Sequence, residues 1–481
     1  MRWLDLGVIA LYLAGITLFG WRFRASQSTL KDYFLGGNTV PWWAIALSIV
    51  SAETSTLTVI GTPSLAFQGN FGFLQLVFGY LLARIVIVTL FLPAYFRGEM
   101  FTAYELMRRR FGEPIRRLTA TTFLVLRALA EGVRVFAVSI VISIILGSGE
   151  MASIVVILCL TLFYTYEGGL TAVIWTDVVQ MLLYVVGAVV SLVLLLHEIP
   201  GGWGHVLNVG VPLGKLQVFD FRLAPPAIFF TRTYSFWAGI IGGCFLTTAS
   251  HGTEQLLVQR LLAARSQKQA QVALLASWVV IFIQFTLFLA IGLCLFVLYR
   301  ENGVQAPAVL DRLYPQYIWQ RLPVGVAGLV MAAILAAAMS NLSAALNALA
   351  STTVLDLWKP LSAPRAESVW MLRSRVSTLV WGAVLFAVAL VARHWGSVLQ
   401  AGLSIASIVY GALLGVFLLG LLTKRVGQAG AIIGMIAGLA VMVYVKFATP
   451  IAFTWYVLIG TSVTFGVGVI TSFLIREKSH A

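Results

Sequence analysis

Oxygen-bearing side chains interrupt an otherwise apolar run from residue 331 to residue 358, MAAILAAAMSNLSAALNALASTTVLDLW. On a helix that advances about 100° per residue, the small and polar residues of this run fall within roughly 60° of one line. That face consists of Ala333, Ala336, Ala337, Ser340, Ser343, Ala344, Asn347 and Ser351. The face predicts either a surface that binds a hard cation through oxygen ligands or a seam of small residues for close helix packing.

A second polar cluster lies in the apolar stretch 42–67, which contains the run ALSIVSAETSTLTVIGTPSLAF. Its hydroxyl and carboxyl side chains are Ser48, Ser51, Glu53, Thr54, Ser55 and Thr56. Such groups are costly in hydrocarbon, where irregular backbone is tolerated only against protein or a cavity. The cluster predicts either a helix broken near Ser51 to Thr54, with carbonyls facing an ion or solute, or a Ser/Thr-rich helix packed on its neighbours.

Three charged residues share one face of the apolar stretch 118–147. Arg127, Glu131 and Arg134 are spaced i, i+4 and i+7, so they lie within about 60° of one another on a helix. They must point into protein, as a structural ion-pair network or as part of a binding site. Two arginines to one glutamate leave a positive charge that Glu53 or a solute carboxylate could balance. Arg84, in the preceding stretch, adds to the buried charge.

Nothing in the sequence pairs a nucleophile with a base, so we expect no enzymatic activity. Loops or the ends of apolar stretches hold His197, His205, His394 and His480, and only His251 enters such a stretch, beside Glu254. The cysteines, Cys159, Cys244 and Cys294, all lie in apolar runs, which indicates neither a disulfide framework nor a cysteine metal site.

The composition is that of a membrane protein, with 60% hydrophobic residues, 10% charged residues and a mean hydropathy of +0.94. A net charge of +14 could suggest nucleic acid, but the basic residues lie in short loops between apolar stretches. We therefore expect a lipid bilayer as surroundings, no nucleic-acid partner and no obligate protein partner.

Thirteen stretches of about 20 apolar residues are predicted to span the bilayer. They are 4–22, 42–67, 73–96, 118–147, 151–166, 174–197, 235–259, 271–299, 323–354, 374–393, 397–422, 428–447 and 454–475. One side collects 20 of the 32 Lys and Arg residues and the other side nine. By the positive-inside rule, the N-terminus is expected outside and the C-terminus in the cytoplasm, in a plasma or inner cell membrane. The long outer loops 198–234 and 300–322 are expected to form caps or short interfacial helices.

Several motifs occur in an order known from one transporter family. Residues 164–180 read YTYEGGLTAVIWTDVVQ, residues 51–53 read SAE, residues 252–255 read GTEQ with QR at 259–260, and residues 420–438 read GLLTKRVGQAGAIIGMIAG. Residues 164–180 resemble the glycine-pair signature of the sodium/solute symporter family, and residues 51–53 resemble its broken first core helix. Residues 252–260 resemble its seventh span, and residues 420–438 resemble its late basic-loop signature. That family includes sodium-coupled sugar, proline, pantothenate and monocarboxylate carriers, and the resemblance covers nearly the whole chain.

The resemblance implies an all-α polytopic membrane protein of the LeuT-type fold, whose core is two five-helix inverted repeats. In a single transporter domain, 1–481, residues 41–199 would form the first repeat and residues 234–422 the second. Segments 1–40 and 423–481 would be peripheral. In this fold the cation lies between the broken helix and the helix of residues 331–358.

The resemblance also implies where a sodium ion would bind. Its ligands would be the carbonyls of Leu47, Val50 and Ala337, the hydroxyl of Ser340 and, where the family usually has Ser or Thr, the amide oxygen of Asn341. A second sodium position would use Asp177, Ser340 and Ser343, although Ala344 stands where some members have another hydroxyl. Sodium would be the coupling ion, with no other cofactor.

The expected function is sodium-coupled symport that imports a small organic solute by alternating access. Solute contacts are expected from Ser51, Glu53, Thr54, Arg134, His251, Glu254 and Gln255. Members that carry sugars tend to have Gln after Ser-Ala-Glu, where this chain has Thr54, and the buried arginines favour a carboxylate or an amino acid. Another solute, such as a sugar, vitamin or inorganic anion, and a solute sensor without transport are the alternatives.

Overall fold

The computed structural model describes residues 2–21, 39–97, 103–164, 170–223, 225–303, 305–358 and 367–475. Apart from one β-bridge between Val40 and Ala264, regular secondary structure in these residues is helical. In chain order the α-helices are α1 (Trp3–Trp21), α3 (Trp42–Glu53), α4 (Thr56–Gln68), α5 (Leu74–Val86), α6 (Leu92–Tyr95), α7 (Ala103–Phe111), α8 (Glu113–Leu146), α9 (Glu150–Tyr164), α10 (Leu170–Glu198), α11 (Gly202–Gly210), α12 (Pro226–Phe229), α13 (Gly243–Thr253), α14 (Gln255–Leu262), α15 (Gln267–Glu301), α16 (Leu313–Arg321), α17 (Val326–Ser351), α18 (Glu367–Ala392), α19 (Val398–Leu422), α20 (Gln428–Ala448) and α21 (Tyr456–Leu474).

The predicted apolar stretches all coincide with helices. Within the described ranges, nine helical stretches are long and apolar enough to cross a membrane, and the bent pair α3–α4 makes a tenth. The other predicted spans coincide with α1 and α9, whose apolar parts are shorter, and with the interrupted helix α13–α14. The number of helices that cross the bilayer therefore stays a prediction.

The predicted break in the second stretch is confirmed, because α3 and α4 are bent by 64° at a short interruption. Thr54 (φ −87°, ψ 85°) and Ser55 (φ −86°, ψ 174°) leave the helical conformation there. The N–H of Thr54 still donates to the Val50 carbonyl at 2.8 Å, which closes the last turn of α3. The polar side chains between Ser51 and Thr56 thus lie at a break in the helix, as their cost in lipid predicts.

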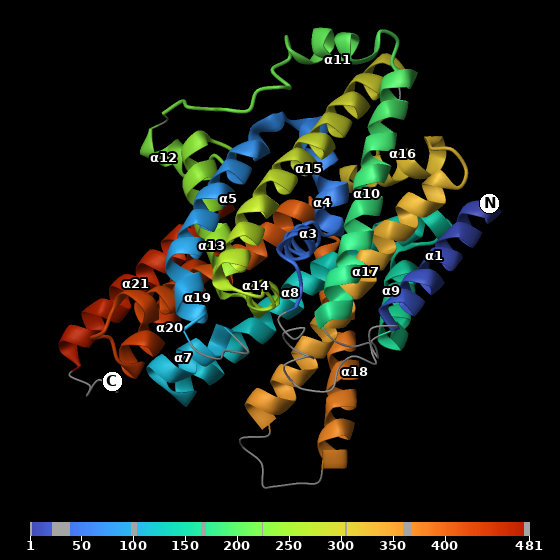
Figure 1. The fold of residues 1–481 in the computed structure, drawn as a ribbon. Helices are drawn as coiled ribbons and strands as arrows, with labels where there is room; N and C mark the ends of the chain where they lie inside the picture. The colour runs from blue at the N-terminus through green and yellow to red at the C-terminus, as the bar shows by residue number, and fades with distance from the viewer. Residues whose placement is uncertain are drawn as a thin grey trace.

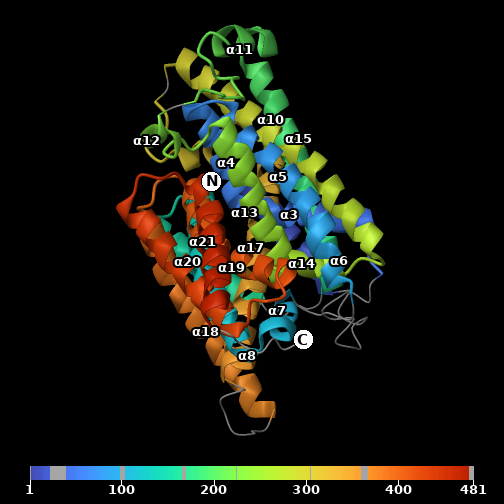
Figure 2. The same ribbon diagram turned by 90° about the vertical axis from the view of Figure 1, so that its left-hand side faces the viewer.

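A second interruption separates α13 from α14. Glu254 is extended (φ −83°, ψ 127°) between the end of α13 at Thr253 and the start of α14 at Gln255. The sequence analysis did not predict this break, although Gly252-Thr253-Glu254 places a glycine and two polar residues together in the seventh stretch. Two broken helices therefore lie inside the bundle, near one another (Figure 1 and Figure 2).

The remaining helices are arranged around these two. Helices α19, α20 and α21 pack against one another along one side of the molecule, and α11 and α7 lie toward opposite ends (Figure 1 and Figure 2). The two long loops that were expected on the outer side contain short helices, α11 and α12 in one and α16 in the other.

Glycine permits close contact between α5 and residues 239–243, at and just before the start of α13. A Cβ added at Gly243 would lie 2.4 Å from the Leu76 carbonyl oxygen, and one at Gly79 would lie 2.6 Å from the carbonyl oxygens of Gly239 and Ile240. These obstacles are backbone atoms, so no side-chain rotation can relieve them. Small residues at such positions let membrane helices pack backbone to backbone.

We predict that Gly243→Ala lowers the stability of the protein by about 1–3 kcal/mol, because the added methyl overpacks this contact. The matched control is Gly466→Ala in α21, where an added Cβ meets nothing within 4 Å. That control should be neutral or slightly stabilising, because Ala favours a helix over Gly by up to about 1 kcal/mol. Thermal unfolding midpoints in detergent measure both, and equal midpoints would contradict the close contact.

Candidate functional site

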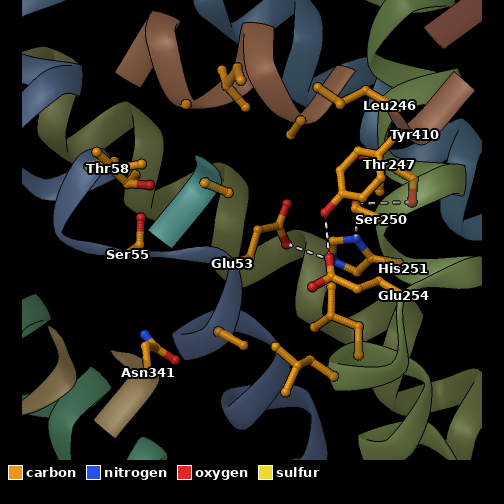
Figure 3. A pocket seen from close by; sticks show the side chains of 18 of the residues that line it. Glu53, Ser55, Thr58, Leu246, Thr247, Ser250, His251, Glu254, Asn341 and Tyr410 are labelled. Atoms are coloured by element: carbon orange, nitrogen blue, oxygen red, sulfur yellow. Dashed lines mark hydrogen bonds and ion pairs between the residues drawn. The ribbon is translucent and has the colours of Figure 1, made fainter. Parts of the chain in front are cut away.

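A cavity of about 160 Å³ lies where the two broken helices face each other. The first break contributes Glu53 and Ser55 and the second contributes Glu254, while Arg134 comes from α8 and Asn341 from α17. Figure 3 shows Glu53, His251, Glu254 and Asn341 turned toward this space, with Tyr410 of α19 beside Glu254. Residues far apart in the sequence therefore surround one cavity, whose lining combines these polar side chains with many apolar ones.

Glu53 is the last residue of α3, and its carboxylate contacts Arg84 and His251. Its Oε2 accepts from Arg84 of α5 at 2.6 Å and lies 3.2 Å from His251 Nε2. The Nδ1 atom of His251 lies 2.8 Å from the Ser250 hydroxyl. Since a carboxylate accepts only, His251 donates from Nε2 to Glu53. Arg84 is fully buried and also donates to Ser277 of α15, so Glu53 is connected to two continuous helices.

The three charged residues of α8 do share one face, and they extend to the second break. Glu131 pairs with Arg127 at 2.9 Å and with Arg134. Arg127 also donates to Glu254 at 2.8 Å, and Glu254 accepts from the Tyr410 hydroxyl. The positive charge that the sequence analysis left for Glu53 or a solute is therefore balanced by Glu254.

Charges of both signs are equal in number in this network. Within the described residues it holds four arginines, Arg84, Arg127, Arg134 and Arg260, and four carboxylates, Glu53, Glu131, Glu254 and Asp177. With a neutral His251 the network has no net charge. An excess of arginine thus cannot by itself identify an anionic solute.

Asp177, expected at a second sodium position, has an arginine as its partner. Its Oδ2 accepts from Arg260 of α14 at 3.0 Å and from Ser48 of α3 at 2.7 Å, and Arg260 Nε also donates to Ser48 at 2.9 Å. Asp177 is buried, and Ser343 is half-buried on α17. The carboxylate is thus already bound to a cationic side chain, and its role as a sodium ligand stays a prediction.

The ligands expected for the first sodium position lie on α3 and α17. Leu47 and Val50 lie in the last two turns of α3, before the break. Asn341 lines both the cavity and an adjacent hollow of about 10 Å³ that Ser55 and Thr56 also line. The side chains of Ala337 and Ser340 lie outside the described part of α17. This group of ligands also stays a prediction.

The expected solute contacts divide into two groups. Glu53, Arg134, His251 and Glu254 line the cavity. Ser51 and Thr54 are buried away from its walls, and the Thr54 hydroxyl donates to Gln284 of α15 at 3.0 Å. Gln255 also lies outside the cavity wall, and its Oε1 accepts from the backbone N–H of Ala103 at 2.8 Å.

Some cavity residues were not among the expected solute contacts. They include Thr58, Ser250, Arg260 and Tyr410, and also Arg127, which the sequence analysis had assigned to an ion-pair network or a binding site. Helix α19 offered a signal, because small and polar residues at Gly402, Ser407 and Gly411 accompany Tyr410 in an apolar run. The contact of Arg260 offered none, since its partner Asp177 is 83 residues away.

We predict that Asp177→Asn destabilises the protein by about 3–5 kcal/mol, because Arg260 would remain buried without its carboxylate. Arg260→Gln in the same chain should recover part of that loss. A double-mutant cycle on thermal unfolding measures the coupling between the two residues. Additive losses would show that the ion pair does not hold α14 to α10.

Comparisons with known proteins agree with this architecture. A model of the sodium:solute symporter family matches residues 33–438. The sodium-coupled monocarboxylate transporter 1 of Xenopus laevis is 30% identical over 434 residues, 88% of this chain and 68% of that protein. The human sodium/iodide cotransporter is 31% identical, covering 93% and 70% of the two chains. The sodium/sialic acid symporter SiaT of Proteus mirabilis is 28% identical, covering 96% and 93%.

Solved structures give the same result. The substrate-bound, outward-open state of a Na+-coupled sialic acid symporter matches with a TM-score of 0.85 at 26% identity, over 99% of each chain. A closed conformation of Mhp1, a nucleobase-cation-symport-1 family transporter, matches with a TM-score of 0.58 at 12% identity over 93% and 96%, which is a likeness of fold alone. The expected all-α, LeuT-type class is confirmed. The chain therefore belongs to the sodium:solute symporter family, as a multi-pass membrane protein that is not an enzyme and that uses sodium as the coupling ion to import a small organic solute.

Proposed function

We propose that the imported solute is a small monocarboxylate and that Arg134 binds its carboxylate. The observation that carries this proposal is the exposure of Arg134, whose side chain lines the cavity and is 26% accessible while its partner Glu131 is fully buried. Its Nε atom has no hydrogen-bond partner within the described residues but is buried, so a solute would be bound through the terminal N–H groups. A guanidinium has five N–H donors in a planar fork, so Arg134 can bind Glu131 and a solute carboxylate together.

The size of the cavity supports a small solute. A cavity of about 150 Å³ holds a benzene-sized ligand of roughly six non-hydrogen atoms. The cavity of about 160 Å³ in this chain is of a size that suits a short carboxylate. Relatives at 30–31% identity are named for monocarboxylates or iodide, which are small monovalent anions.

Sodium is proposed to bind between the end of α3 and the middle of α17. Its ligands would be the carbonyls of Leu47, Val50 and Ala337, the Ser340 hydroxyl and the Asn341 amide oxygen. Such a site supports coupling on electrostatic grounds. The cavity network has no net charge when His251 is neutral, so a bound sodium makes the chamber positive and favours an anion, and the anion favours sodium by the same factor.

The number of sodium ions decides how far an anion can be accumulated. One ion down roughly 100 mV contributes about 2.3 kcal/mol, and a tenfold gradient adds about 1.4 kcal/mol. A monovalent anion carried with one sodium ion makes the transported pair neutral, so the membrane potential contributes nothing. The tenfold sodium gradient alone then allows about tenfold accumulation of the anion. A second sodium, at Asp177, Ser340 and Ser343, would restore the contribution of the membrane potential and allow several thousandfold accumulation.

The orientation and the repeats are further parts of the proposal. The basic residues support an outside N-terminus and a cytoplasmic C-terminus in the cell membrane. Repeats at residues 41–199 and 234–422 are supported by the two breaks, because α3–α4 and α13–α14 are the first long helices of those segments. Segments 1–40 and 423–481 would then be peripheral to the core.

The test is uptake by the purified protein in proteoliposomes, with and without a sodium gradient. The panel comprises lactate, acetate, iodide, sialic acid, proline and glucose. We expect sodium-dependent uptake of the short carboxylates. In Arg134→Ala the apparent KM for the carboxylate should rise about tenfold or more, because a charge-assisted hydrogen bond contributes about 1.5–3 kcal/mol.

Folding should survive this substitution, because Glu131 keeps Arg127 as its partner at 2.9 Å. Arg109→Gln on the exposed face of α7 is the charge-matched control and should transport normally. Iodide taken up in preference to carboxylates would favour the inorganic-anion alternative. An unchanged KM in Arg134→Ala would return Arg134 to a structural network.

Substitution of Ser340 tests the proposed sodium site. Ser340→Ala removes one hydroxyl with little change in volume, so the sodium concentration for half-maximal uptake should rise at least about fivefold while folding persists. High sodium should restore solute affinity, as linkage requires. Ser343→Ala should give a smaller shift if one sodium binds and a comparable shift if Asp177 holds a second. Unchanged sodium dependence in Ser340→Ala would leave this face of α17 as a packing seam.

A further inference from the structure

Helix α17 begins without a cap of its own. The residues before Val326 are Leu322-Pro323-Val324-Gly325, and none has a side chain that accepts hydrogen bonds. The first N–H groups of a helix have no partner within the helix, and Ser, Thr, Asp or Asn usually supplies one. The N-cap residue is Gly325 (φ 89°), which has no side chain to accept a hydrogen bond from the first turn.

The missing cap comes from Asp5 on α1. Asp5 Oδ1 accepts from the N–H groups of Gly325 at 2.7 Å and Gly328 at 2.8 Å, and the residue is completely buried. Its Oδ2 lies 2.9 Å from Arg2 Nε. A helix outside the proposed ten-helix core thus caps a helix inside it.

Arg2 extends this contact to the preceding helix. Its guanidinium donates to the carbonyls of Trp319 and Leu322, the latter at 2.6 Å, and lies 5.6 Å from the centre of the Trp319 ring. Arg2, just before α1, and Asp5, in the first turn of α1, therefore hold the end of α16 and the start of α17 together. We call Arg2 and Asp5 the α1 clamp.

The contact also requires a glycine on α17. A Cβ added at Gly328 would lie 2.7 Å from both Asp5 Cα and its carbonyl oxygen. Below the clamp, Ile9 and Ile16 continue the buried face of α1, while Leu4, Leu11 and Leu18 are exposed. Helix α1 therefore lies along α17, as Figure 1 shows.

We propose that Asp5 is a positioning residue for the sodium site, an inference that rests on the proposed site at α17. The oxygens proposed to bind sodium lie about three to four turns along α17 from the clamp, and the other ligands lie on α3. A cation site depends on the fixed spacing of its oxygens. Because the clamp fixes the start of α17, it fixes the height at which Asn341 meets the break of α3.

The experiment measures sodium binding without any solute. The thermal unfolding midpoint of the purified full-length protein is recorded against sodium concentration, with potassium holding ionic strength constant, and the rise gives a sodium dissociation constant. In Asp5→Asn this constant should rise about fivefold, because the cap weakens and the charge on Arg2 loses its partner. Gly328→Ala, which changes no charge, should raise it as well.

Two controls separate positioning from general stability. Leu4→Ala, beside Asp5 but 74% exposed, should leave the sodium dissociation constant unchanged. Arg2→Gln keeps the Asp5 cap on α17 and should raise the sodium dissociation constant about twofold. This variant still tests the proposal if Asp5→Asn does not fold. The proposal would be overturned if Asp5→Asn and Arg2→Gln lowered the thermal unfolding midpoint without sodium but left the sodium dissociation constant unchanged. If the unaltered protein itself shows no sodium-dependent rise, the proposed sodium site fails first.

Discussion

Two helices are interrupted inside this bundle, and each interruption places a carboxylate where water is scarce. Glu53 at the first break pairs with Arg84 of α5, and Glu254 at the second pairs with Arg127 of α8. Removing one partner of a buried pair costs several kcal/mol, because the remaining charge is left without compensation. Each break is therefore stable only against a particular continuous helix, and the cavity is the space that these two pairings leave.

The same constraint limits how the broken helices can move. Arg260 of α14 binds Asp177 of α10 and Ser48 of α3, so both interrupted helices contact a continuous helix through one buried ionic group. A shift of α3 or α14 must either carry its partners along or break a buried pair. Intermediate positions are costly, and packed interfaces of this kind favour a few discrete arrangements. Alternating access requires such discrete states.

The fold could be predicted from the sequence, but the partners of the buried charged and polar side chains could not. Periodicity and length located the apolar helices, and the polar residues from Ser51 to Thr56 located the first break, because lipid penalises them in a continuous helix. The second break was missed because Glu254 follows only a short polar segment. Partners were unpredictable since Arg127 could reach Glu131 on its own helix, whereas its contact with Glu254 spans 127 residues. Likewise, Thr54 and Gln255 have the chemistry of solute contacts, but their neighbours Gln284 and Ala103 hold them outside the cavity.

If the solute is the proposed carboxylate, the balance of buried charges affects how it could be bound. If the cavity carried surplus arginine, it would bind anions without any cation and release them poorly. With its charges paired, the chamber would attract the proposed carboxylate more strongly when sodium adds to the contact with Arg134, which is the condition for coupling. Asn341 is suited to transmit that attraction, because it lines both the cavity and the smaller hollow beside Ser55 and Thr56. Its amide has an oxygen for a cation and an N–H2 group for a carboxylate, so one side chain can contact both when both are bound.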